Sequence, residues 1–250
     1  MSLDIVEQEG ALRLRLNRPE RRNAFTPDMV DRLEEGVRLA IADPACRCIV
    51  VEGAGDHFCA GRDLRAFSEE KPLAELRRDD DRWAGIFRRL DEADTPSVAI
   101  VRGYAFAGGF TLAMGCDFVL ADHTARFQVS EMRHGFPAAI NTPVLSNLVG
   151  PRLALELAIL GETVAAERLH AMGLINRLEA DADALRAAAE AFIATLIERD
   201  PGAVGETKRL HRATRDGGLS EALNAGSLIN TQASLSGVFK TAGDKLAKKD

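Results

Sequence analysis

The chain has 250 residues, of which 46% are hydrophobic and 28% are charged, a composition typical of a globular protein with a large buried core. Its net charge of −6 argues against nucleic acid or an anionic membrane surface as the main partner. No apolar stretch approaches the roughly 20 residues that span a bilayer, and the first residues lack the basic start and apolar run of a secretory signal, so we expect a cytoplasmic protein with no membrane partner.

The chain opens with a predicted β-hairpin followed by a helix. Apolar residues alternate over Leu3–Gln8 and Leu12–Leu16, which is typical of two paired strands. Thr26 and Pro27 then supply an N-cap and a proline at the first helical position, and apolar residues follow at helical spacing. The apolar run Cys48–Val51 predicts a buried strand.

Two glycine-rich turns are the most informative feature of the sequence. FCAGRDL at Phe58–Leu64 follows the strand at 48–51, and GYAFAGGF at Gly103–Phe110 follows another predicted strand, Ser97–Val101. Each turn opens into a segment that reads as helix, so each leaves unpaired backbone N–H groups at the positive end of a helix dipole. Two such turns, with small residues where the main chain must come close, suggest a pair of donors that converge on one oxygen atom, which is an oxyanion hole.

Residues 66–93 follow the first turn and are dense in charge. They include the only tryptophan, Trp83. The interpretation we favour is a solvated helix with ion pairs between residues four apart. The position of this segment also permits a mobile cover over a site.

The rest of the chain predicts further β–turn–α units and then a helical tail, which together favour an α/β core. Thr163 is the predicted N-cap of one helix and Gly173 its end. Beyond Asp183 the sequence reads as helix, broken at Pro201, Gly217-Gly218 and Ser236-Gly237. The remaining predicted elements are the helices 109–114, 137–148, 152–160 and 165–172 and the strands 116–121, 125–129 and 174–178.

Several common chemical motifs are missing from the sequence. The second glycine turn lacks the Gly-Lys-Ser/Thr ending of a P-loop, no G-x-G-x-x-G opens the first strand–helix unit, and no G-x-S-x-G nucleophile elbow is present. The cysteines have neither zinc-site nor disulfide spacing, so we expect no metal and interpret them as small buried hydrophobes. They are Cys46, Cys48, Cys59 and Cys116.

One acid stands out as a candidate catalytic group. Glu131 lies in FQVSEMRHGFP at Phe127–Pro137, after a predicted strand and among Val129, Met132 and Phe136. An apolar pocket raises the pKa of a carboxyl group by desolvation, as a general base near neutral pH requires. The alternative is a glutamate at a helix N-terminus that interacts with the helix dipole, and composition alone favours this alternative.

Five motifs follow one another along the chain. They are LNRPERRNAF at 16–25, FCAGRDL at 58–64, GYAFAGGFTLAMGCDFVLA at 103–121, FQVSEMRHGFP at 127–137 and GETVAAERLHAMGLINRL at 161–178. In this order they resemble the motifs of the crotonase superfamily, the enoyl-CoA hydratases and isomerases. The resemblance runs from about Val6 to about Ile193 and, more weakly, to the C-terminus.

The resemblance implies a fold, an assembly and a substrate. The fold is α/β, a crotonase-like spiral of ββα units that forms two stacked sheets, with a C-terminal helical region that packs trimers. We assign residues 1–195 to the spiral core and 196–250 to the helical trimerisation region, and expect a homotrimer or a hexamer built from two trimers. The implied substrate is an acyl-CoA thioester, in which coenzyme A is part of the substrate and not a separate cofactor.

By the same resemblance, the backbone N–H groups of Ala60 and Gly108 hold the thioester oxygen, and Gly61, Arg62 and Asp63 line the same substrate-binding turn. One such donor stabilises a negative oxygen by roughly 3–4 kcal/mol in a dry site. Arginines in the two segments that flank the nucleotide end are candidate partners of its phosphates. They are Arg21, Arg22, Arg62 and Arg65.

The departures from the family pattern decide the chemistry that we expect. Family hydratases use two glutamates; Thr111 matches the first and Glu131 the second, and a threonine hydroxyl orients a water but does not take its proton near pH 7. Family dienoyl isomerases carry an aspartate where this chain has Ala139. A lone acid at position 131 resembles the 3-enoyl-CoA to 2-enoyl-CoA isomerases, in which one carboxylate removes a proton from C2 and returns it to C4.

We therefore expect an acyl-CoA enzyme of fatty-acid metabolism, an isomerase or lyase that stabilises a thioester enolate. Glu131 shuttles the proton, and Thr111 is an orienting or pocket residue. Isomerisation is modestly favoured over hydration. The alternatives are an enoyl-CoA hydratase that adds water to 2-enoyl-CoA and a catalytically silent acyl-CoA binder.

Overall fold

The computed structural model describes residues 2–67 and 70–246. Residues 68–69, within the charged segment predicted as a helix, lie outside the described residues. The chain forms two compact units, Met1–Val204 and Gly205–Asp250, and each is described by itself.

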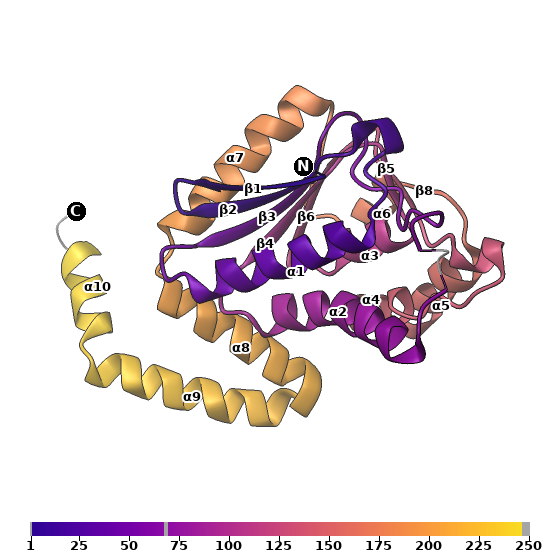
Figure 1. Cartoon of the computed structure of the whole chain (residues 1–250). Coiled ribbons are helices and arrows are strands. Elements are labelled where there is room, and N and C mark those ends of the chain that lie inside the picture. Colours follow the sequence, from indigo (N-terminus) through magenta and orange to yellow (C-terminus); the bar gives the residue numbers. More distant parts are fainter. Residues whose placement is uncertain (1, 68–69, 247–250) are drawn as a thin grey trace. The chain divides into compact units, whose positions relative to one another are not determined.

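A six-stranded sheet forms the centre of the first unit (Figure 1). Its strand order is β1-β2-β3-β4-β6-β9. The first two strands form the predicted antiparallel hairpin, and all other neighbours pair in parallel. The strands are β1 (Leu3–Gln8), β2 (Ala11–Leu16), β3 (Cys48–Gly53), β4 (Ser97–Val101), β6 (Phe118–Asp122) and β9 (Arg177–Glu179).

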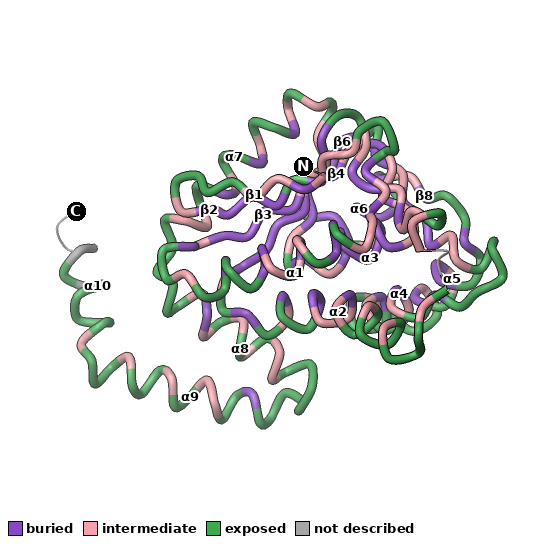
Figure 2. The backbone as a smooth tube through the Cα atoms, in the orientation of Figure 1, coloured by how far each residue is buried: buried purple, intermediate pink, exposed green. Residues whose placement is uncertain are grey.

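The inner strands of this sheet, β2, β3, β4 and β6, are largely buried, as the purple stretches of the tube in Figure 2 show. Along β3, Cys48 and Val50 pack with residues of α7 (Ala182–Glu198). Ile49 and Val51 belong to the core on the other face, with α1 (Pro27–Ala42) and α2 (Leu73–Glu92). Because successive side chains of a strand point to opposite faces, a strand covered on both sides reads as a continuous apolar run.

The start of α1 confirms the predicted cap. The side chain of Thr26 accepts a hydrogen bond from the amide of Met29, and Pro27 is the first helical residue. The cap satisfies one of the N–H groups that a helix start leaves unpaired. The preceding residues form a short 3-10 helix, η1 (Pro19–Arg21).

The charged segment after the first glycine turn forms a helix, α2, but this helix is not simply solvated. Its arginines pair with α1, where Arg82 contacts Asp31 and Arg89 contacts Glu34. Its other face is buried at helical spacing by Trp83, Ile86, Phe87 and Leu90. The packed face fixes α2 against the core beside the first glycine turn.

A three-stranded sheet, ordered β5-β7-β8, completes the first unit. β5 (Tyr104–Phe106) and β7 (Arg126–Gln128) pair in parallel, and β8 (Val164–Ala165) runs antiparallel to β7. The prediction of Thr163 as an N-cap is therefore wrong, because the chain is still extended at 164–165. Ala165 occupies the cap of α6 (Ala166–Ala171) without a side-chain hydrogen bond.

The remaining helices of this unit follow the predicted order with shifted ends. α3 (Gly108–Met114) and α5 (Pro151–Leu160) begin within one residue of the prediction. α4 (Asn141–Leu148) begins at Asn141 and not at 137, because the chain first forms the 3-10 helix η2 (Glu131–His134) and an irregular turn.

The tail is helical with breaks where they were predicted, at Pro201, Gly217-Gly218 and Ser236-Gly237. Its helices after α7 are α8 (Pro201–Gly217), α9 (Leu219–Leu235) and α10 (Val238–Leu246). In the second unit, α9 exposes Leu223 and Leu228. Across the described ranges, no helix has the length and apolar character needed to cross a bilayer. The division at 195/196 and the trimerisation role of the tail stay predictions.

Candidate active site

The segment before α1 holds the first glycine turn in place. Asn23 is fully buried and donates from Nδ2 to the carbonyls of Ala54 and His57. Arg18 donates to Oδ2 of Asp63 from both terminal nitrogens, each at 3.2 Å. Desolvation acts to raise the pKa of Asp63, but the hydrogen bond and the charge of Arg18, together with the backbone amides of Arg65 and Ala66, outweigh it, so this pKa lies below its ordinary value. Asp63 thus fastens the turn to the segment before α1.

The two glycine turns pack against each other. Gly61 has a φ of +94°, and a Cβ at this position would lie 2.9 Å from both the Cβ of Ala107 and the carbonyl oxygen of Phe106. A Cβ on Gly109 would lie 2.2 Å from the carbonyl oxygen of Cys59. Only glycine permits so close an approach, so these two positions allow the main chains of the turns to touch.

The amide of Ala60, which we predicted as the first oxyanion donor, is already used. It donates to the carbonyl oxygen of Arg22 at 3.0 Å. An N–H group engaged in this way is not available to a substrate oxygen, so the prediction for Ala60 is wrong. The sequence does not reveal this hydrogen bond because it depends on how two distant segments pair.

The amides of Arg62 and Gly108 are the unused donors at this junction. Arg62 pairs with Phe25 in a parallel bridge, whose two hydrogen bonds involve Gly61 and Asp63. The N–H of the bridged residue itself points away from Phe25. Gly108 is the first residue of α3, where an N–H group has no partner within the helix. Neither amide donates to a residue within the described ranges.

An aromatic cluster lies directly behind Gly108. A Cβ at this position would lie 2.7 Å from two ring atoms of Phe25 and 3.2 Å from the indole of Trp83. These two rings are stacked, with centroids 4.6 Å apart, and Phe67 and Phe87 meet them edge-on. A side chain at position 108 would displace this cluster, so the glycine has a packing role that the sequence does not reveal.

Glu131 begins η2 and is half-buried. Desolvation raises the pKa of its carboxyl group, against the lowering effects of its hydrogen bonds and of the charges of Arg62 and His134. Oε1 accepts a hydrogen bond from Nδ2 of Asn141 at 2.8 Å. Oε2 is buried and has no partner in the part of the chain that the structure describes. Because buried polar atoms are rarely left unpaired, Oε2 is the free acceptor of this site.

The surroundings of Glu131 bear on the two interpretations of this residue. Val129 is buried, whereas Met132 and Phe136, expected to help enclose the carboxyl group, are each 43% exposed. The helix that Glu131 begins is a 3-10 helix of four residues. So short a helix carries little dipole, which argues against the dipole interpretation.

Thr111 and Asn141 complete a buried polar chain that ends at Glu131. Thr111 lies in α3 and donates from Oγ1 to Oδ1 of Asn141 at 2.8 Å. Asn141 in turn donates to Glu131, and it also approaches the carbonyl oxygen of Ala107 at 3.3 Å. Both Thr111 and Asn141 are 1% exposed. Sequence analysis missed Asn141, because an asparagine at the start of a helix carries no chemical signature of its own.

The four arginines proposed for coenzyme A phosphates differ in their surroundings. Arg21, Arg22 and Arg65 are exposed. Arg62 is half-buried and pairs with Asp80 of α2 at 2.8 Å. A phosphate bound by Arg62 must therefore compete with this carboxylate.

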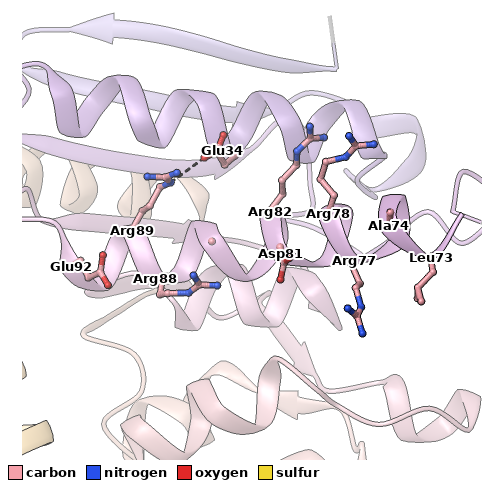
Figure 3. A pocket seen from close by; sticks show the side chains of 11 residues that line it. Glu34, Leu73, Ala74, Arg77, Arg78, Asp81, Arg82, Arg88, Arg89 and Glu92 are labelled. Atoms are coloured by element: carbon pink, nitrogen blue, oxygen red, sulfur yellow. Dashed lines mark hydrogen bonds and ion pairs between the residues drawn. The ribbon is translucent and has the colours of Figure 1, made fainter. Parts of the chain in front are cut away.

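A surface groove of about 920 Å³ runs along α2, as Figure 3 shows. Arg82 and Arg89 on its wall pair with α1. None of the candidate site residues lines this groove. We interpret it as the charged surface beside α1 and not as the reactive site.

All four cysteines are buried, as predicted. Within residues 2–67 and 70–246, no group of three or more histidine, cysteine, aspartate and glutamate side chains is arranged to hold a metal ion.

The α/β fold, with two glycine turns packed together and a half-buried carboxyl group, is the architecture of crotonase-like proteins. A family model described as enoyl-CoA hydratase/isomerase matches residues 6–234. The chain belongs to this family of acyl-CoA enzymes, as the motifs predicted.

Similar proteins support this assignment. A putative enoyl-CoA hydratase from Thermus thermophilus is 35% identical over 90% of this chain and 89% of its own length. A 1,2-epoxyphenylacetyl-CoA isomerase from Escherichia coli is 36% identical over 67% of this chain and 66% of its own length. The crystal structure of an enoyl-CoA hydratase from Mycobacterium smegmatis superposes with a TM-score of 0.88 at 28% identity, over 98% of this chain and 97% of that one. The predicted crotonase fold is confirmed.

Proposed function

We propose that this protein isomerises 3-enoyl-CoA to 2-enoyl-CoA, with Glu131 as the group that moves the proton. The observation that carries the proposal is the state of this carboxyl group. It is half-buried with a raised pKa, and one oxygen is held by Asn141 while the other is buried and unpaired. A base that is desolvated and has one free oxygen suits proton abstraction near neutral pH.

The amides of Arg62 and Gly108 supply the complementary part of the mechanism. Removal of a proton from C2 leaves negative charge on the thioester oxygen, and two backbone donors stabilise that charge. Asn141 contacts both Glu131 and Ala107, the residue before Gly108. The base and the residue that precedes the second donor thus contact the same amide side chain, which supports the action of the base and the donor on one substrate.

The proposed reaction needs only one acid–base group. Glu131 takes a proton from C2 of the 3-enoyl thioester, and the C3–C4 double bond becomes part of a dienolate. The protonated carboxyl group then returns the proton to C4, which leaves the double bond between C2 and C3 and restores the carboxylate. No water enters the balance, so no second carboxylate is required.

Hydration is the second candidate function, because most of the relatives named above are described as hydratases. The hydrogen-bonding state of Thr111 argues against it. Addition of water requires a group that orients the water and accepts its proton, and the Thr111 hydroxyl is buried and donates to Asn141. A threonine hydroxyl does not accept a proton near pH 7.

The remaining parts of the proposal concern binding and assembly. We propose that the exposed Arg21, Arg22 and Arg65, with Arg62, contribute to binding the coenzyme A phosphates. We also propose that the chain acts in the cytoplasm and assembles as a trimer or as a hexamer of two trimers through its C-terminal helices. The leucines that α9 exposes support the assembly, because they offer apolar surface.

The test compares two substrates of the purified protein, 3-hexenoyl-CoA and 2-hexenoyl-CoA, by the absorbance of the conjugated enoyl thioester. We expect the absorbance to rise with the first substrate and to change slowly with the second. Glu131→Gln should lower kcat/KM by roughly 10²–10⁴-fold, whereas Glu162→Gln, an exposed matched control, should not change it. Rapid loss of the 2-enoyl thioester with formation of 3-hydroxyacyl-CoA would establish hydration instead. Binding by calorimetry without turnover of either substrate would identify a silent binder.

A further inference from the structure

Asn141 has a buried side-chain amide, and its described hydrogen bonds all join it to Glu131 or to residues at the second glycine turn and α3. It is 1% exposed and is the first residue of α4. Its described contacts reach Glu131 at 2.8 Å, Thr111 at 2.8 Å and the carbonyl oxygen of Ala107 at 3.3 Å. Burial of an asparagine costs free energy unless its amide group is hydrogen-bonded. These three contacts therefore account for an asparagine at this buried position.

The chemistry of the neighbours fixes which way this amide points. An ionised carboxylate and a backbone carbonyl only accept hydrogen bonds, so the NH₂ group must face Glu131 and Ala107. The amide oxygen then faces Thr111, whose hydroxyl donates to it. Thr111 thus supports the orientation of the Asn141 amide that Glu131 and Ala107 require, and that orientation presents a donor to the carboxylate.

We propose that Asn141 is a positioning residue that holds Glu131 by Oε1 and leaves Oε2 as the oxygen that takes and returns the proton, with Thr111 holding Asn141 in turn. The effect of Asn141 on catalysis rests on the proposed function, whereas its hold on the Glu131 carboxyl group does not. It gives Thr111 a role that the family comparison does not suggest, because the residue acts through Asn141 and not on a water molecule.

The electrostatic consequence has a definite sign. Donation from Asn141 favours the ionised form of Glu131, so loss of the donor should raise the pKa of the carboxyl group further. The charged groups that also act on Glu131 are Arg62 and His134. Both are retained in variants of Asn141, so the difference between variant and wild type isolates the amide.

The experiment uses Asn141→Ala and Thr111→Val in the full chain, with Thr111→Ser as the conservative rescue. Thr142→Val is the matched control, because the Thr142 hydroxyl lies on the same helix and donates only to the carbonyl of Ala138 among the described residues. One readout is the pH dependence of kcat/KM with 3-hexenoyl-CoA. The other is the pKa of Glu131 from carbon NMR of protein with labelled glutamate, in which Glu131→Gln assigns the signal.

We expect Asn141→Ala to move the NMR pKa and the acidic limb of kcat/KM upward by about one pH unit. The value of kcat should fall roughly 10–100-fold, because the base loses its orientation, with little change in KM. Thr111→Val should move the pKa in the same direction by a smaller amount, and Thr111→Ser should restore it. Thr142→Val should leave both readouts at wild-type values.

An unchanged Glu131 pKa in both Asn141→Ala and Thr111→Val would overturn the inference. If Asn141→Ala does not fold, the comparison of Thr111→Val with Thr111→Ser decides alone. The NMR titration needs no substrate, so it also decides the role of Asn141 if the protein turns over no enoyl thioester. In that case the proposed function fails while the positioning role is judged independently.

Discussion

The contact between the two glycine turns makes Gly61→Ala the sharpest test of the site geometry. An alanine at this position would keep a φ of +94°, which is left-handed and costs an L-residue roughly 1–2 kcal/mol. Its Cβ would also lie 2.9 Å from both Ala107 and Phe106, and crowding of this kind costs typically about 1–3 kcal/mol. We therefore expect the free energy of unfolding to fall by roughly 2–5 kcal/mol.

Gly173→Ala is the matched control for this prediction. Gly173 has a φ of +80°, but a Cβ there would meet no atom within 4 Å. The control should therefore lose only the conformational part, roughly 1–2 kcal/mol. Urea unfolding at one protein concentration, followed by circular dichroism, measures both values.

The same pair of variants tests whether contact between the two turns also affects activity. The Cβ of Gly61→Ala would lie 3.4 Å from the Gly108 amide nitrogen, so relief of the crowding should move the turns apart. We expect kcat/KM to fall by at least about tenfold, since a small misplacement of donors weakens transition-state stabilisation. Gly173→Ala should retain full activity. Equal destabilisation of the two variants, or wild-type activity in Gly61→Ala, would refute the reasoning.

Three further predictions follow from the site and its support. Glu131→Gln should be more stable than wild type at neutral pH. The pKa of Glu131 is raised in the native state, so the wild type loses stability as pH rises through that pKa, whereas the glutamine variant does not. Parallel curves of unfolding free energy against pH for the two proteins would contradict this. Arg18→Met should cost about 1–3 kcal/mol at neutral pH, since it leaves the Asp63 carboxylate without its charged partner. Because the pKa of Asp63 is lower in the native state than in the unfolded state, the ionised carboxylate stabilises the native state above the unfolded-state pKa, and this stabilisation is lost as pH falls. The loss of stability caused by Arg18→Met should therefore be smaller in acid, as urea midpoints at several pH values will show. Trp83→Ala should cost about 3–5 kcal/mol and Trp83→Phe less, which thermal unfolding will measure.

The helices and strands were predictable where local signals and tertiary structure agree. The hairpin over 3–16, the cap at Thr26 and the tail breaks at Pro201 and Gly218 all rest on short-range chemistry, and each appears in the structure. The prediction of Thr163 as an N-cap was wrong because Val164 pairs with β7, which keeps the chain extended beyond Thr163. A strand partner far along the chain overrides a local preference of this kind.

The site was predictable at the level of segments but not of every donor, since the amide of Gly108 is unused as predicted and that of Ala60 is not. The two glycine turns meet as their composition indicated, and Glu131 is desolvated as predicted, although Met132 and Phe136, two of the neighbours on which the prediction rested, are exposed. Whether an N–H group is free depends on which carbonyl lies opposite, so Ala60 was chosen where Arg62 is unused. Asn141 was invisible for the same reason, because its importance lies in what it contacts.

The position of Trp83 against Gly108 has a practical consequence. The chain contains one tryptophan, and it is 4% exposed and stacked on Phe25 beside the unused amide. Intrinsic fluorescence excited at the indole band therefore originates from a single fluorophore adjacent to the second glycine turn. Its emission should be blue-shifted in the native protein, and quenching by added acyl-CoA would report occupancy of this turn without any label.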